Sequence, residues 1–97
     1  MASAGSLLRV DDLGPLISYL VLEKGAPVYA ANGQKVGRVT EIRADLEKDI
    51  FDGLVVDGGL LPGDDRLVPA DQVDEIYERG VALRLDADAF KALPKPD

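Results

Sequence analysis

The sequence predicts an all-β fold: a small six-stranded antiparallel barrel with an apolar N-terminal arm and a short C-terminal helix. Apolar segments of strand length recur at close spacing through the 97 residues. Turn signals separate these segments, the strongest being Asn32-Gly33. Short strands at this spacing indicate a small barrel or sandwich, and closing the sheet into a barrel removes its free edges.

The arm, residues 1–24, is apolar, and its pattern fits two structures. Four residues have the i, i+3, i+4, i+7 spacing of one helix face; they are Leu13, Leu16, Ile17 and Leu20. The short apolar run at residues 19–22 fits a buried strand equally well. In either form the arm is too apolar to remain in water. It must therefore pack on the barrel or on another chain.

A hairpin opens the predicted barrel. Residues 26–31 and 34–45 are the two strands, and Asn32-Gly33 between them tolerates the positive φ of a type I′ turn. Apolar residues of the second strand are three apart, a spacing that would place them on alternating faces; they are Val36, Val39 and Ile42. A β-bulge at Gly37 would restore one inward face.

The rest of the predicted barrel consists of four strands and the helix. The third strand of the barrel, residues 50–57, is nearly continuous in apolar residues, as expected for a strand covered on both faces. The later elements are strands at 67–70, 72–78 and 81–85 and a helix at 87–93. Asp86 is the predicted helix cap, and Pro94 ends the helix. The chain thus divides into an arm (1–24), a barrel domain (25–93) and a tail (94–97).

Composition argues against several classes of function. Lys and Arg total 11 against 18 Asp and Glu, a net charge of −7, whereas nucleic acids and anionic membranes attract basic surfaces. The chain has no cysteine, which excludes disulfides and thiolate sites. It has no histidine, the commonest general base and metal ligand. An enzyme is therefore not expected.

The location predicted from the sequence is the cytoplasm. The apolar runs are far shorter than the roughly 18–20 residues that a membrane-spanning helix needs. The first residues are small and lack the basic region of a signal peptide.

The hairpin and the strands after it resemble the PRC-barrel family. The matching residues, between Gly25 and Leu85, are Val28, Asn32, Gly33, Val36, Gly37, Val39, Asp45, Leu54, Val55, Val56, Val68, Pro69, Val73, Ile76, Val81 and Leu83. Members of this family include the cytoplasmic domain of the photosynthetic reaction centre H subunit and the C-terminal domain of the bacterial ribosome maturation factor. The resemblance implies a small barrel that binds other proteins or itself, with no shared catalytic residues to carry over.

The expected function is protein interaction without catalysis, through self-association as a homodimer. Apolar residues exceed what one small core takes up, because they fill the arm and also stand in the loop at residues 58–66. The candidate interaction residues are Leu13, Leu16, Tyr19, Leu60 and Leu61. A two-fold dimer would bury these side chains against each other or exchange the arms. The alternative is an adaptor that docks on a larger protein assembly through its acidic face and the 58–66 loop, with a basic protein as partner.

A small-ligand or calcium site is a minor alternative. Five aspartates in or near the 58–66 loop offer oxygen ligands; they are Asp57, Asp64, Asp65, Asp71 and Asp74. Their spacing is not that of an EF-hand. No metal and no cofactor is therefore assigned.

Overall fold

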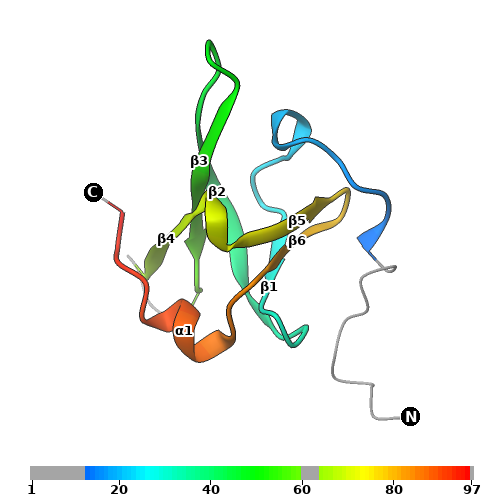
Figure 1. Ribbon diagram of the computed structural model, residues 1–97. Helices are drawn as coiled ribbons and strands as arrows, with labels where there is room; N and C mark the ends of the chain where they lie inside the picture. The colour runs from blue at the N-terminus through cyan, green and yellow to red at the C-terminus, as the bar shows by residue number, and fades with distance from the viewer. Residues whose placement is uncertain (1–12, 60–63, 97) are drawn as a thin grey trace.

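The described part of the chain, residues 13–59 and 64–96 of a computed structural model, forms one six-stranded sheet and a short helix (Figure 1). The strands are β1 (Pro27–Tyr29), β2 (Lys35–Asp45), β3 (Ile50–Asp57), β4 (Asp65–Pro69), β5 (Val73–Tyr77) and β6 (Gly80–Leu83). Two 3₁₀ turns, η3 (Tyr19–Val21) and η4 (Ala70–Gln72), precede β1 and β5, and the helix is α1 (Ala87–Lys91). The six predicted strands and the C-terminal helix are confirmed, with small shifts at their ends.

The sheet is mixed, so the prediction of an antiparallel barrel is wrong in strand direction. The order is β4-β3-β2-β1-β6-β5, and β1 and β6 run parallel while the other neighbours run antiparallel. The parallel pairing arises at η4, between β4 and β5, because the chain bends there without reversing direction as it would in a hairpin. As a result β4 and β5 run in the same sense. Within the described residues no ladder joins these two strands, so the sheet has two edges and is not closed.

Segments near the two ends of the described chain cover both edges. On the β5 side, the Ile17 N–H donates to the Ile76 carbonyl (3.0 Å), and the Arg79 N–H donates to the Leu13 carbonyl (2.8 Å). On the β4 side, the Leu67 N–H donates to the carbonyl of Pro94 (2.9 Å). The arm thus satisfies backbone groups that an exposed edge would offer to other chains. Its structure is an extended stretch followed by η3, and neither of the two predicted forms describes all of it.

Two irregularities shape the long β2–β3 hairpin. In β2 the register against β1 shifts at Val36, next to the predicted bulge at Gly37. A Cβ on Gly37 would overlap the carbonyl of Asp57, so β3 approaches too closely for any other residue. In β3 the register against β2 shifts between Phe51 and Gly53. The extra residue places Phe51 on the same face as Leu54.

The core is one cluster of buried residues drawn from nearly every element. Its buried residues are Leu22, Val28, Val39, Leu54, Val56, Val68, Val73, Ile76, Val81, Leu83 and Phe90. Phe90 comes from α1, whose first turn is capped by the Asp86 side chain accepting from the Ala89 N–H (2.8 Å). Leu22 comes from the arm. Both ends of the described chain are therefore tied into one cluster.

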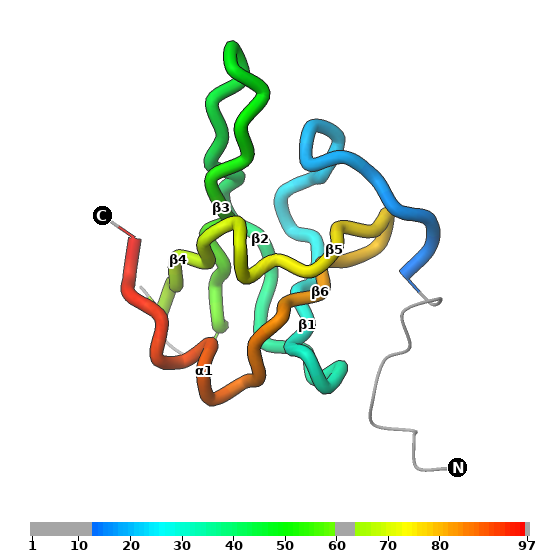
Figure 2. The backbone as a smooth tube through the Cα atoms, in the orientation of Figure 1, coloured from blue at the N-terminus to red at the C-terminus, as the bar shows by residue number. Residues whose placement is uncertain are grey.

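The distal half of the β2–β3 hairpin projects beyond the rest of the sheet, and the arm lies beside it (Figures 1 and 2). The two are joined by side chains: the Tyr19 ring stacks on Phe51 with centroids 5.1 Å apart, and the Tyr19 hydroxyl donates to Asp49 (2.6 Å). None of the helices described here is long and apolar enough to cross a membrane.

Candidate interaction surfaces

The structure separates the predicted interaction residues. Leu13 is only 4% exposed and anchors the arm. Leu16 is 59% exposed, and Tyr19 is half-buried against the hairpin. Leu60 and Leu61 lie outside the described residues.

The arm carries three large exposed apolar residues, which we call the arm face: Leu16 (59%), Leu20 (59%) and Val21 (62%). The arm itself is held in place, because Leu13 and Leu22 on either side of the arm face are buried. The Ser18 hydroxyl accepts from the Leu20 N–H (3.0 Å) and caps η3. The arm face is therefore a fixed surface and not a loose tail.

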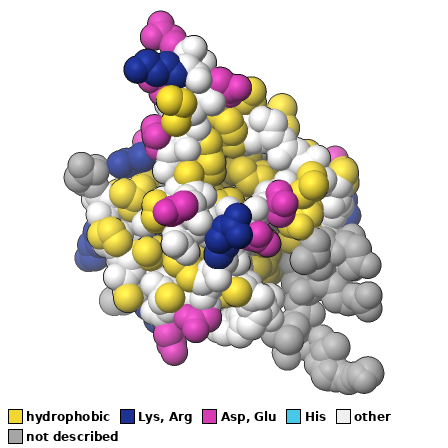
Figure 3. Space-filling view, viewed as in Figure 1, with side chains coloured by type: hydrophobic (Ala, Val, Ile, Leu, Met, Phe, Trp, Pro, Cys, Tyr) yellow, Lys and Arg dark blue, Asp and Glu magenta, His cyan; other side chains and the backbone are white. Residues whose placement is uncertain are grey.

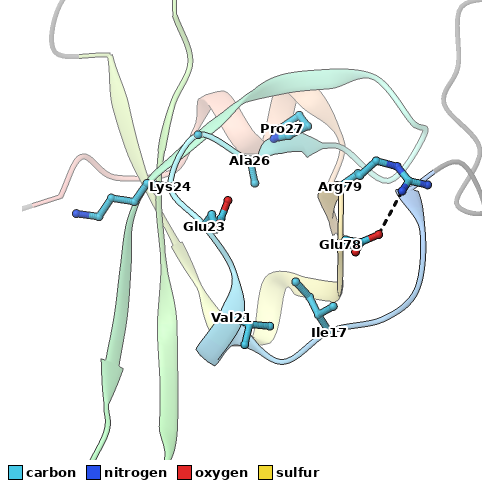
Figure 4. A pocket seen from close by; sticks show the side chains of 9 residues that line it. Ile17, Val21, Glu23, Lys24, Ala26, Pro27, Glu78 and Arg79 are labelled. Atoms are coloured by element: carbon cyan, nitrogen blue, oxygen red, sulfur yellow. Dashed lines mark hydrogen bonds and ion pairs between the residues drawn. The ribbon is translucent and has the colours of Figure 1, made fainter.

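Beside the arm face is a hollow of ≈ 580 Å³, the arm pocket (Figure 4). Its lining residues are Ile17, Val21, Glu23, Lys24, Gly25, Ala26, Pro27, Glu78 and Arg79. Two carboxylates and two cations balance in charge, and Glu78 pairs with Arg79 at 3.2 Å. Both of these side chains are more than half exposed, so they lie at the rim. The volume suits a small molecule, about 300–1,000 Å³, but these charged groups face solvent and each other.

Between the arm and the hairpin lies a shallow hollow of ≈ 190 Å³, the edge depression. It is lined by Ile17, Phe51, Ala70, Val73, Asp74, Glu75 and Ile76. Its charged lining residues are two carboxylates. In the space-filling view, hydrophobic side chains continue from the projecting hairpin into the hollow beside it, with acidic side chains nearby (Figure 3).

Two tyrosines report the negative potential at this end of the molecule. The hydrogen bond to Asp49, followed by partial desolvation and by the charges of Asp49, Asp45 and Asp52, raises the pKa of Tyr19 from 10.0 to about 12. The pKa of Tyr77 is raised too, first by desolvation and then by the carboxylates of the neighbouring strand residues Asp74 and Glu75. Ionised tyrosine is disfavoured because carboxylates already gather there.

A third hollow, of ≈ 480 Å³, has the opposite charge. This helix groove is lined by Gln34, Lys35, Val36, Gly58, Asp64, Arg66, Ala87, Phe90 and Lys91. It has three cations against one carboxylate, and Arg66 pairs with Asp64 at 3.2 Å. The lining of the arm pocket is thus neutral, that of the edge depression is negative and that of the helix groove is positive.

The aspartates considered for calcium form no ligand cluster within residues 13–59 and 64–96. Asp57 accepts from the Gly59 N–H (2.8 Å), which closes a local turn. Asp64 pairs with Arg66, and Asp74 pairs with Arg84 at 3.4 Å. These contacts explain three of the five aspartates, Asp57, Asp64 and Asp74, as turn and ion-pair groups.

The comparisons with known proteins agree with the fold. The model of the PRC-barrel domain family matches residues 18–89, which is most of the chain. A search of curated proteins finds no match.

Proposed function

The chain belongs to the PRC-barrel family, and on this premise we propose that it is a non-enzymatic protein-interaction module that self-associates as a homodimer. Domains of this family are generally non-catalytic binding modules. The observation that carries the proposal is the arm face, three large apolar side chains exposed on a segment anchored at both ends. Exposed apolar surface of this kind marks interaction sites.

The charge balance of the neighbouring arm pocket favours a second copy as the partner. A two-fold contact sets the same patch against itself. With a net charge of −7, most acidic patches on this molecule would repel their own copy. The arm pocket has two carboxylates and two cations, so Glu23 or Glu78 of one copy can approach Lys24 or Arg79 of the other.

A stable dimer needs more surface than the arm face alone supplies. Specific interfaces bury about 800 Å² per partner. The contact must therefore extend from the arm face over the arm pocket, which shares Val21 with it. The arm face would form the apolar centre of the interface and the charged pairs its rim.

Sedimentation equilibrium of the full chain tests this proposal. We expect about twice the chain mass of 10.3 kDa at ~100 µM, a concentration at which contacts of micromolar affinity are saturated. The double variant Leu20→Glu/Val21→Glu should be monomeric, because it places four like charges in the interface of a dimer.

Leu46→Glu is the matched control. Leu46 is 72% exposed in the turn of the β2–β3 hairpin and belongs neither to the arm face nor to the lining of the arm pocket, so this variant should remain dimeric. A monomeric full chain, or equal behaviour of the arm variant and the control, would refute the homodimer.

A second candidate is an adaptor that docks on a larger protein assembly. The observation that favours it is the edge depression, whose carboxylates suit a basic partner. The expected contact at the 58–66 loop falls partly on residues outside the described part. A cytoplasmic location is part of both proposals.

A further inference from the structure

We propose that the edge depression binds an extended segment of a partner protein, a segment with one large apolar side chain flanked by Lys or Arg. This inference deepens the adaptor role and does not depend on the homodimer. The proposal follows from the contacts that hold the apolar residues at the floor of the depression, from the size of the depression and from its charge.

The floor is preorganised by three separate elements. Phe51 reaches it from the hairpin, because the irregularity before Gly53 turns this side chain to the core face. Ile17 reaches it from the arm, fixed by the hydrogen bond from its N–H to the Ile76 carbonyl (3.0 Å). Val73 and Ile76 of β5 are 8% and 9% exposed and complete the floor. Since these contacts already hold the floor, a ligand need not order it.

The size of the depression selects a single side chain. At ≈ 190 Å³ it is smaller than the sites of small molecules and cofactors, about 300–1,000 Å³. Protein interfaces commonly place one apolar anchor in such a hollow and surround it with polar contacts. A Leu, Ile, Phe or Met side chain is the matching anchor.

The charge around the depression selects basic flanking residues. Asp74 and Glu75 are in its lining, and Asp49 and Asp52 act on Tyr19 at the hairpin side. Arg84 pairs with Asp74, but this exposed pair leaves the remaining carboxylates in excess. Cations that flank the anchor would meet carboxylates on either side of it.

A second copy of the chain fits this depression poorly. The same surface on another copy has like charge, which costs binding energy. The basic surface of another copy is the helix groove, which is itself concave. A hollow cannot supply the projecting anchor that another hollow requires.

Selection of peptides on the full chain tests the proposal. We expect a random peptide array to enrich sequences with one large apolar residue between Lys or Arg residues. Amide shifts in NMR spectra with a selected peptide should change most at Ile17, Phe51 and Ile76. No enrichment, enrichment of acidic peptides, or shifts centred on Lys35 and Lys91 of the helix groove would overturn the assignment.

Matched charge reversals then separate local contact from net charge. Glu75→Lys should lower the affinity for the selected peptide at least about tenfold, because it places a positive charge next to the Lys or Arg residues that flank the apolar anchor. Asp88→Lys changes the net charge equally on α1 and should leave the affinity within about twofold. Equal losses in the two variants would show that only the overall charge matters.

The proposal of a homodimer and the proposal of a peptide site can be refuted independently of each other. Leu20→Glu/Val21→Glu alters no residue of the edge depression, so this variant should still bind the selected peptide. Loss of binding there would show that the site is not the depression.

Discussion

At the scale of single residues, the close approach of β3 to Gly37 requires a glycine in β2. A Cβ at this position would overlap the Asp57 carbonyl, and backbone cannot move aside as a flexible side chain can. We expect Gly37→Ala to lower the free energy of unfolding by about 2–3 kcal/mol, the upper part of the range of about 1–3 kcal/mol for overpacking. Gly25→Ala is the comparison, because a Cβ there meets open space and only the positive φ of 92° opposes it, at about 1 kcal/mol. Urea unfolding of both variants measures this; a smaller loss for Gly37→Ala contradicts the close-approach account.

Also at this scale, Tyr19 makes stability depend on pH in the alkaline range. Its pKa is about 12 in the folded chain against 10.0 for a free tyrosine, so the folded state holds the proton more tightly. The resulting stabilisation is present below pH 10 and is lost as the pH rises from about 10 to about 12.

Denaturation at a series of alkaline pH values tests this dependence. Tyr19→Phe keeps the ring against Phe51 and removes the hydroxyl, so its stability should fall less than that of the parent chain over this window. Tyr29→Phe on β1 is the control. Parallel curves for the parent and Tyr19→Phe would contradict the role of the bond to Asp49.

At the scale of elements, local signals predicted the strands, while long-range contacts decided their arrangement. Asn32-Gly33 marks the β1–β2 turn, and the apolar run of residues 50–57 coincides with β3. The parallel pairing of β1 with β6 follows from the corner at η4, whose geometry no short pattern encodes. The helical spacing in the arm does not correspond to one buried face, because Leu13 is buried while Leu16 and Leu20 are exposed.

The candidate sites, like the strand arrangement, depend on long-range contacts that local sequence patterns do not encode. Leu16 and Tyr19 were predicted for interaction, whereas the edge depression was not. Its floor unites Ile17 with Phe51 and Ile76, residues far apart in sequence, and a register shift turns Phe51 inward. Only the acidic composition of this region was visible in the sequence.

The pairing of the arm with β5 is a separate prediction. Ile17→Pro removes the N–H that donates to Ile76, so the arm should detach more often. We expect faster hydrogen exchange at the amides of Glu78 and Arg79, which donate to arm carbonyls. Ile17→Ala keeps the N–H and should slow exchange relative to Ile17→Pro; equal rates in the two variants would contradict the pairing.

At the scale of the whole molecule, charge is distributed unevenly over the surface. The arm pocket is balanced, the edge depression is negative and the helix groove is positive. Salt should therefore affect the two proposed contacts differently. From about 0.05 to 0.5 M salt, binding of the selected basic peptide should weaken clearly, whereas the dimer, whose centre is apolar and whose charged pairs lie at the rim, should weaken less, because screening acts on charge contacts. Sedimentation and calorimetry across this range test the contrast, and an equal salt dependence would contradict it.

The way in which the ends of the described chain hold the sheet also has a mechanical consequence. A force that pulls on those ends acts on the two edges and loads few hydrogen bonds at a time. On the β5 side, the bond to Leu13 is loaded first, then the bond from Glu78 to Pro15, and then the one from Ile17 to Ile76. Under tension the arm should therefore peel away in steps at low force, before the buried strands bear any load.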